Sequence, residues 1–422
     1  MITIPSTTFW AWNSPHGGRL TGVSLVFLSV IILGGFLKSN AVKAEPFIPD
    51  NDGYVLEVLP ESLIPSTGGD MNDVAALEKR MAQYPDNPDL LEQLVRRYIE
   101  LERKTVDQRY LSFAETLLRP WFNKETPAPM IVYVLQARID QRLHRYEPAL
   151  GHLSKITPTS IYSIEAISLR AAIHLAQGRF AEMYVDCRQM AQTGEMVLSI
   201  NCFAQIYGYT GRAALMYERL SAILENVARS DAEKQEVLIT LGNLASVMGE
   251  VGNAVKHYKQ ALTINPENTY VKNMLAEIYL QTGEKEALKN LIVGTVPDNG
   301  ILIKAVIAEK RYGRMFAASN FEKDLERSFD SQRLRENVLI SREYARYLLD
   351  IKDQPEDALE VALQNWLHQR EAEDTLLLMR AAKASGRVNT VNTVITWLRD
   401  TGFDDVRINK VKNELPAAKN AS

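Results

Sequence analysis

The chain has 422 residues, of which 46% are hydrophobic and 24% are charged, and its formal net charge is −4. This length can bury one or two large cores, so folding requires neither a metal nor a dense set of disulfides. A mildly acidic chain also argues against nucleic acid and anionic lipid as partners.

The first 44 residues differ from the rest of the chain. They contain three basic residues and no acidic residue, and residues 20–37 (LTGVSLVFLSVIILGGFL) carry no charge. Val42 and Ala44 fit the −3 and −1 positions of a signal-peptidase site, so we expect a signal peptide that is cleaved after Ala44. The alternative is an N-terminal membrane anchor, because 18 apolar residues can just cross a bilayer. We therefore expect an exported protein, either periplasmic or anchored to the inner membrane by residues 20–37.

The region after this segment divides into a linker and a repetitive part. Residues 45–70 are rich in Pro, Asp and Ser, which is typical of a linker. Across residues 71–295, one residue that suits a turn between two helices recurs about every 34 residues. The members of this series are His144, Gly178, Gly211, Gly249 and Gly283.

The clearest units lie within residues 235–295. Gly242 on one expected helix and Ala254 on the next are small enough to let two antiparallel helices approach closely. Tyr258 fills the space beside them, and Pro266 ends the second helix because proline cannot continue the hydrogen-bond ladder. These positions resemble the tetratricopeptide repeat (TPR) family, whose helix-turn-helix units stack into a solenoid.

The period loosens in residues 301–410, but helical pairs with alanine at their crossings are still readable there. Residues 411–422 are expected to form a flexible tail. The fold class predicted for the chain is all-α, a right-handed TPR-like α-solenoid in which roughly eight to nine antiparallel helix pairs form a superhelix.

Most of the chain also resembles a group of exported bacterial TPR proteins of unassigned activity. That resemblance implies an extracytoplasmic binding scaffold and no particular chemistry. The strings that carry it, besides the two cysteines, are DQRYLSFAETLLRPWF (107–122), SREYARYLLDIKDQPEDALEVALQNWLHQRE (341–371) and WLRDTGFDDVRI (397–408).

TPR proteins bind peptides in a concave groove lined by the first helix of each pair. Some use a Lys and two Asn to hold a partner's C-terminal carboxylate, but here Ile239 and Met274 replace the Lys and one Asn, and only Asn243 matches. Each candidate groove residue also has a plainer interpretation as ordinary solvent-facing helix surface. The candidates in the best-defined units are Glu236, Ile239, Asn243, Ser246, Tyr270, Asn273 and Glu277.

Cys187 and Cys202 are the only cysteines. Aligned to the repeat, they fall on helices that pack against each other, so a disulfide is expected in an oxidising compartment. The alternative is two small buried hydrophobic residues. A metal site is not expected, because no histidines with suitable spacing accompany the two thiols.

The sequence contains no HExxH, G-x-S-x-G or phosphate-binding glycine-rich motif, so we expect neither an enzyme nor a cofactor. The expected partner is a protein or peptide, possibly from the envelope or a membrane. Two alternatives remain open, an all-helical periplasmic enzyme acting on glycan and a membrane-anchored assembly factor. The acidic run with Glu371, Glu373 and Asp374 could serve the enzyme, but it is also the composition of a solvated helix face.

Overall fold

The computed structural model describes residues 68–226, 230–293, 298–313, 320–336 and 341–415, which are almost entirely helical and contain no β-strand. The first half of the described chain contains α1 (Gly68–Gln83), α2 (Pro88–Thr105), α3 (Arg109–Phe122), α4 (Met130–Arg142), α5 (Tyr146–Leu153), α6 (Ser163–Ala176), α7 (Phe180–Gln192), α8 (Met196–Tyr207), a short π-helical turn η2 (Gly208–Arg212) and α9 (Ala213–Asn226). The second half contains α10 (Asp231–Met248), α11 (Val251–Ile264), α12 (Thr269–Thr282), α13 (Lys285–Val293), α14 (Asn299–Tyr312), α15 (Phe321–Glu336), α16 (Arg342–Asp350), α17 (Pro355–His368), α18 (Ala372–Ala384), a 3-10 turn η3 (Val388–Val391), α19 (Asn392–Thr401) and α20 (Val406–Glu414).

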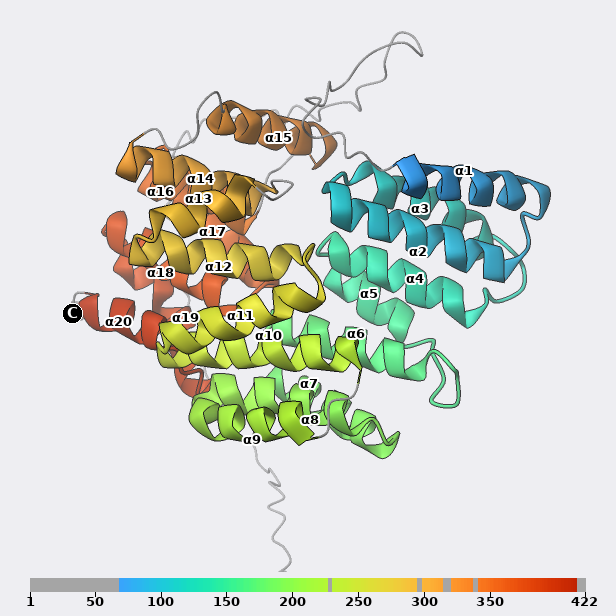
Figure 1. The fold of residues 1–422 in the computed structure, drawn as a ribbon, viewed down its shortest axis with the longest axis horizontal. Coiled ribbons are helices and arrows are strands. Elements are labelled where there is room, and N and C mark those ends of the chain that lie inside the picture. Colours follow the sequence, from blue (N-terminus) through green and yellow to red (C-terminus); the bar gives the residue numbers. More distant parts are fainter. Residues whose placement is uncertain (1–67, 227–229, 294–297, 314–319, 337–340, 416–422) are drawn as a thin grey trace, which may run out of the picture. The chain divides into compact units, whose positions relative to one another are not determined.

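Neighbouring helices pack as pairs from α2/α3 to α16/α17, and the pairs stack in chain order (Figure 1). The first helix of one pair contacts the first helix of the next, as in α2 with α4, α12 with α14 and α14 with α16. This all-helical arrangement of stacked pairs is that of an α-solenoid. The predicted fold class is confirmed at this level.

A residue with left-handed backbone conformation connects the two helices of most pairs. The five turn residues predicted from the repeat all have positive φ, from 56° at His144 to 87° at Gly211. Val106, Asp353 and Gly386 also have positive φ and extend the same series at both ends of the stack. The sequence pattern missed Val106 because a β-branched residue rarely adopts this conformation.

Helices α10 and α11 of one pair approach each other closely. A Cβ atom added to Gly242 would come within 2.5 Å of the ring of Tyr258, so only glycine fits at this crossing. Tyr258 is completely buried, as are Ala254 and Ala261 on the same helix. The small residues of the repeat therefore serve the packing role that the sequence predicts.

The hydrophobic core is continuous over the second half of the stack, and one cluster runs from Leu238 in α10 to Ile408 in α20. Helix α1 begins at Gly68 and α20 ends at Glu414, so helical structure reaches into both the expected linker and the expected tail. The expected signal or anchor segment, residues 1–44, lies outside the described residues.

Cys187 of α7 and Cys202 of α8 form a disulfide, as the sequence analysis expects, with their Cα atoms 5.6 Å apart. Both residues are buried in a small core with Met183 and Met190. The bond joins the second helix of one pair to the first helix of the next and therefore ties two adjacent units of the stack.

We predict that Gly242→Ala lowers the free energy of unfolding by about 1–3 kcal/mol, because the new methyl group must displace the buried ring of Tyr258. The matched control is Gly252→Ala in α11, where an added Cβ meets nothing within 4 Å. That change should leave stability equal or slightly higher. Urea denaturation of both variants measures the difference. Equal stability of the two variants would contradict the proposed crossing.

Candidate functional site

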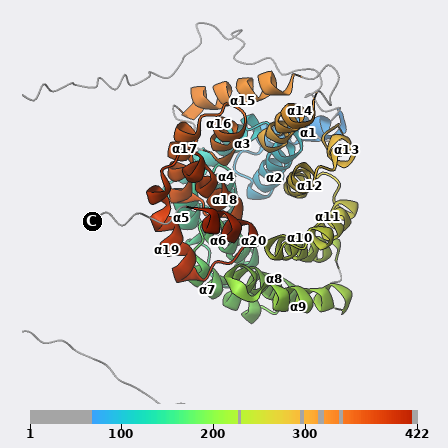
Figure 2. The same cartoon turned by 90° about the vertical axis from the view of Figure 1, so that its left-hand side faces the viewer.

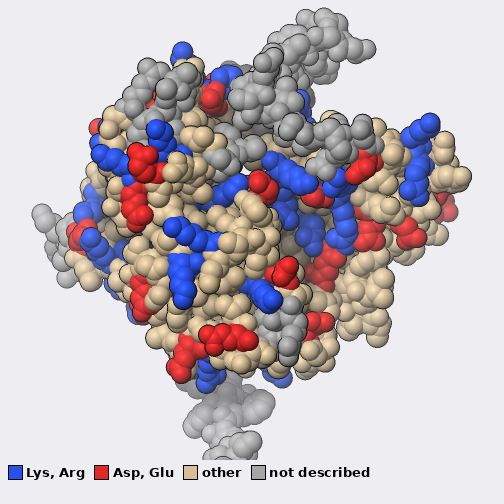
Figure 3. All heavy atoms as spheres, viewed as in Figure 1, with Lys and Arg blue, Asp and Glu red and all other residues tan. Residues whose placement is uncertain are grey.

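The first helices of the pairs place a row of polar side chains on one side of the stack. We call this side of α10, α12, α14, α16 and α18 the inner face. Figure 3 shows the surface hollowed between the region of α12 and that of α2 and α4, with Lys and Arg side chains gathered at the rim. The inner face contains the predicted groove residues together with a set of charged residues that the repeat pattern does not predict.

Asn243 of α10 and Tyr270 of α12 come together on the inner face. The Oδ1 atom of Asn243 accepts hydrogen bonds from the hydroxyls of Tyr258, at 2.7 Å, and Tyr270, at 2.9 Å. Because both bonds use the oxygen, the Nδ2 group of Asn243 keeps its two N–H donors, and no described residue accepts from them. This site thus offers a fixed pair of donors beside an aromatic ring.

Tyr270 is 43% exposed, although the surrounding protein raises the pKa of its hydroxyl well above the usual value by burial. Glu236 in α10 combines the same two properties, an exposed side chain and a pKa that burial raises, and the nearby charge of Arg103 on α2 opposes that increase. Side chains that contact solvent while protein surrounds them line a recess rather than a convex surface. Glu236 and Tyr270 therefore line a recess of the inner face, which we call the hollow.

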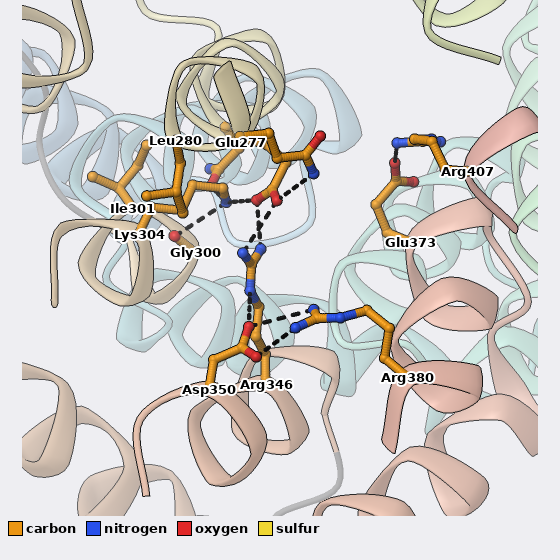
Figure 4. Close-up of polar contacts among 12 residues, drawn as sticks. Glu277, Leu280, Gly300, Ile301, Lys304, Arg346, Asp350, Glu373, Arg380 and Arg407 are labelled. Atoms are coloured by element: carbon orange, nitrogen blue, oxygen red, sulfur yellow. Dashed lines mark hydrogen bonds and ion pairs between the residues drawn. The ribbon is translucent and has the colours of Figure 1, made fainter. Parts of the chain in front are cut away.

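An ionic network connects four successive first helices further along the inner face (Figure 4). Arg346 of α16 binds Glu277 of α12 with Nη1–Oε2 at 2.5 Å and Nη2–Oε1 at 3.1 Å. Its Nε atom binds Asp350 at 3.2 Å, and Asp350 accepts from Nη2 of Arg380 on α18 at 2.5 Å. Burial disfavours the charge of Glu277, but Arg346 and Lys304 outweigh it and hold the pKa of this carboxyl well below its usual range.

Lys304 of α14 occupies the other side of Glu277. Its Nζ atom donates to Oδ1 of Asn273 at 2.9 Å and lies 4.0 Å from Oε2 of Glu277. The amide of Asn273 in turn donates to Asp298, which caps the start of α14 by accepting from the N–H of Ile301 at 2.7 Å. Burial lowers the pKa of Lys304, and the carboxylate of Glu277 opposes the decrease.

Two further arginines bind the acidic run that starts α18. Arg342 donates to Asp374 at 2.8 Å and to Glu371 at 2.5 Å. Arg407 of α20 donates to Glu373 at 2.8 Å, and this charge outweighs burial and lowers the pKa of Glu373. The acidic run is therefore a set of ion-pair partners and not a solvated helix face.

The structure separates the predicted groove residues into two groups. Glu236, Asn243 and Tyr270 present groups to the hollow, whereas Asn273 and Glu277 are held in bonds within the protein. Ile239 packs against the main core, and Ser246 donates to the carbonyl oxygen of Gly242.

The residues that sequence reasoning missed lie beyond residue 300, where the repeat loosens. The missed residues are Lys304, Arg342, Arg346, Asp350 and Arg380 on the inner face and Arg407 on α20. A usable signal was present in α16, because Arg342, Arg346 and Asp350 recur every four residues and so share one helix face.

Neither a metal site nor a membrane span is found in the part of the chain that the structure describes. No three His, Cys, Asp or Glu residues there are grouped to hold a metal ion. Of the helices in the described ranges, none is both long and apolar enough to cross a bilayer. Residues 20–37, the candidate anchor, are outside these ranges.

Comparison with known proteins gives a short partial likeness. No family model matches the chain. A segment of 57 residues is 40% identical to the BBSome complex member bbs-4 of Caenorhabditis elegans, and it covers 13% of this chain and 12% of that protein. The chain thus matches about an eighth of this relative's length, and this likeness assigns no family.

We predict that Glu277→Gln lowers the free energy of unfolding at neutral pH by about 2–4 kcal/mol, because it leaves Arg346 without its main partner in a site where the Glu277 side chain is only 17% exposed. The folded pKa of Glu277 lies below the ordinary value of 4.5, so its stabilising effect is complete above that pH and is lost as the pH falls further. The difference between wild type and variant should therefore shrink in acid.

Denaturant unfolding at a series of pH values measures this difference. Glu218→Gln changes an exposed residue of α9 and is the matched control, with almost no effect expected. A difference between wild type and Glu277→Gln that stays constant down to acidic pH would show that Glu277 is not stabilised as a carboxylate.

Proposed function

We propose that this protein is a non-catalytic protein-binding scaffold of the bacterial cell envelope. In this proposal the helix pairs form a right-handed TPR-like superhelix that binds an extended peptide segment of a partner on its inner face. The observation that carries the proposal is the pair of Asn243 and Tyr270, whose free amide donors and exposed ring lie at the hollow.

The chemistry of this pair suits a polypeptide. An extended peptide presents backbone carbonyl oxygens, which the Nδ2 group of Asn243 can bind without any change in its own hydrogen bonds. The ring of Tyr270 offers apolar area to a neighbouring side chain of the peptide. Glu236 and Arg103 place one charge of each sign near the same hollow and would select the polarity of the segment.

Two features support a location outside the cytoplasm. The first is the uncharged segment 20–37 with its cleavage signal at Ala44. The second is the disulfide between Cys187 and Cys202, since structural disulfides persist in oxidising compartments such as the periplasm. The partner would then be an envelope or membrane protein, and retention of residues 1–44 would make the chain a membrane-anchored assembly factor.

An all-helical enzyme acting on glycan is the second candidate, and one observation favours it. Burial raises the pKa of Glu236, as a general acid requires, and this residue faces the hollow. The release of reducing ends from peptidoglycan fragments, measured with wild type and Glu236→Gln, tests this candidate. Turnover that the substitution abolishes would replace the scaffold proposal.

We predict that peptides selected from a random displayed library on the full chain bind at the inner face. Asn243→Ala should weaken the binding of such peptides about tenfold, which is the loss expected for one or two hydrogen bonds. Fluorescence anisotropy with a labelled selected peptide measures the affinity. Tyr184→Ala, which removes an exposed ring on α7, is the control and should leave affinity unchanged. Equal affinity for wild type and Asn243→Ala would place binding elsewhere.

A further inference from the structure

Two segments far apart in the sequence meet where the last helices reach α7 and η2 (Figure 2). Trp397 of α19 packs on Phe180 of α7 with ring centroids 6.3 Å apart. Phe403 packs on Phe180 at 6.1 Å and on Tyr209 of η2 at 5.5 Å. We call these four aromatic residues the clasp.

Two backbone hydrogen bonds accompany the clasp. The N–H of Arg370 donates to the carbonyl oxygen of Ala176 at 2.7 Å, and the N–H of Asp404 donates to that of Tyr209 at 2.8 Å. Trp397 also lies directly on the turn between α6 and α7, where a Cβ atom added to Gly178 would come within 2.6 Å of its ring. The hydrogen bonds and the close approach at Gly178 therefore fix how the two segments lie against each other.

The clasp is nevertheless a partly exposed contact, and in the described part of the chain its polar support is limited to these two hydrogen bonds. Phe180, Tyr209 and Trp397 are only half-buried. Among the described residues, no ion pair links α17–α20 to α6–α9. One like-charge pair opposes the contact instead, since burial and the nearby charge of Arg179 both lower the pKa of Arg370.

The attachment of the same helices to the rest of the stack is much stronger. Helices α18 and α20 share the continuous core with α10–α17, whereas the clasp forms only the edge of this core, where Phe180, Tyr209 and Trp397 pack partly buried beside Phe403. The ionic network adds bonds from α18 to α16 and from α16 to α12. Helix α20 also contacts α10, where Val406 lies against Gly249. In a stack of neighbouring units, the connection with the fewest contacts opens first while the helices remain folded.

We propose that α18–α20 detach from and return to α6, α7 and η2 as one body at the clasp, and that this opening widens access to the inner face. The first half of this inference concerns the fold alone. The second half rests on the proposed function, because access to the inner face matters only if a partner binds there.

Site-resolved amide hydrogen exchange on the full chain tests the opening. The N–H groups of Arg370 and Asp404 report on the clasp, and that of Leu378 inside α18 reports on helix unfolding. We expect the two clasp amides to exchange with equal opening free energies and at least about tenfold faster than Leu378. Exchange of all three amides at one common rate would overturn the proposal, because the clasp would then open only when helices α18–α20 unfold.

A matched pair of variants on α7 makes the assignment specific. Phe180→Ala removes a ring of the clasp, and Tyr184→Ala removes a ring one turn further along that meets Phe203 edge to face. Phe180→Ala should accelerate exchange at Arg370 and Asp404 about tenfold or more and leave Leu378 unchanged, and Tyr184→Ala should change none of the three. Acceleration of Leu378 to the same degree would contradict opening as one body.

Thiol labelling tests the access to the inner face without any partner. Both native cysteines are in the disulfide, so Tyr270→Cys introduces a single reactive thiol in the hollow. A maleimide carried on a long polyethylene glycol chain should react faster when Phe180→Ala is added, while N-ethylmaleimide should react at the same rate. If the large reagent reacts at equal rates with and without Phe180→Ala, the clasp does not control access to the inner face. A failure of peptide binding at Asn243 would leave both results intact and would count against the proposed function alone.

Discussion

The close crossing of the two helices within a pair determines where the inner face lies. At the α10–α11 crossing, the absence of a side chain on Gly242 lets the ring of Tyr258 lie flat between the helices. From that position its hydroxyl reaches Asn243, the next residue along α10, and the hydroxyl of Tyr270 from the following pair reaches the same oxygen. A packing constraint in the core thus fixes the orientation of a polar group at the surface. The hydrogen-bonding capacity of the inner face follows from that geometry.

Charge then divides the inner face into two parts with different properties. From α12 to α18, Glu277 pairs with Arg346 and Lys304, and Asp350 is shared between Arg346 and Arg380, so the charges hold these helices in register. Charged groups in such surroundings are tolerated only when each has a partner, and here few bonding positions remain for a ligand. On α10, by contrast, Asn243 takes part in no such ion pair, and its Nδ2 group keeps two N–H donors for a ligand. The hydrogen-bonding groups that remain available to a ligand therefore lie at the hollow, toward α10 and α2.

The sequence was sufficient for the local features of the fold. The spacing of His144 and the glycines predicted the turns, and the small residues predicted the crossings, because both are properties of a single unit. Contacts between different units could not be predicted from the sequence in the same way. Arg346 and Glu277 are 69 residues apart in the sequence. Their pairing depends on the orientation of helix α16 relative to helix α12, which belongs to a different pair. For that reason Glu277 was a candidate for partner binding on sequence grounds and is an ion-pair partner in the structure.

The geometry of the clasp depends on the arrangement of many successive units. The rotation between successive units of a solenoid is small, and it must accumulate over many units before the last helices can meet α7. A slight change at any crossing is multiplied along the stack, so the contact of Trp397 and Phe403 with Phe180 is sensitive to the packing of every pair between them. Rings that stack over a half-buried area tolerate small lateral shifts better than a network of short ion pairs would. An aromatic contact without ion pairs is thus suited to a position where the small deviations of many units add up.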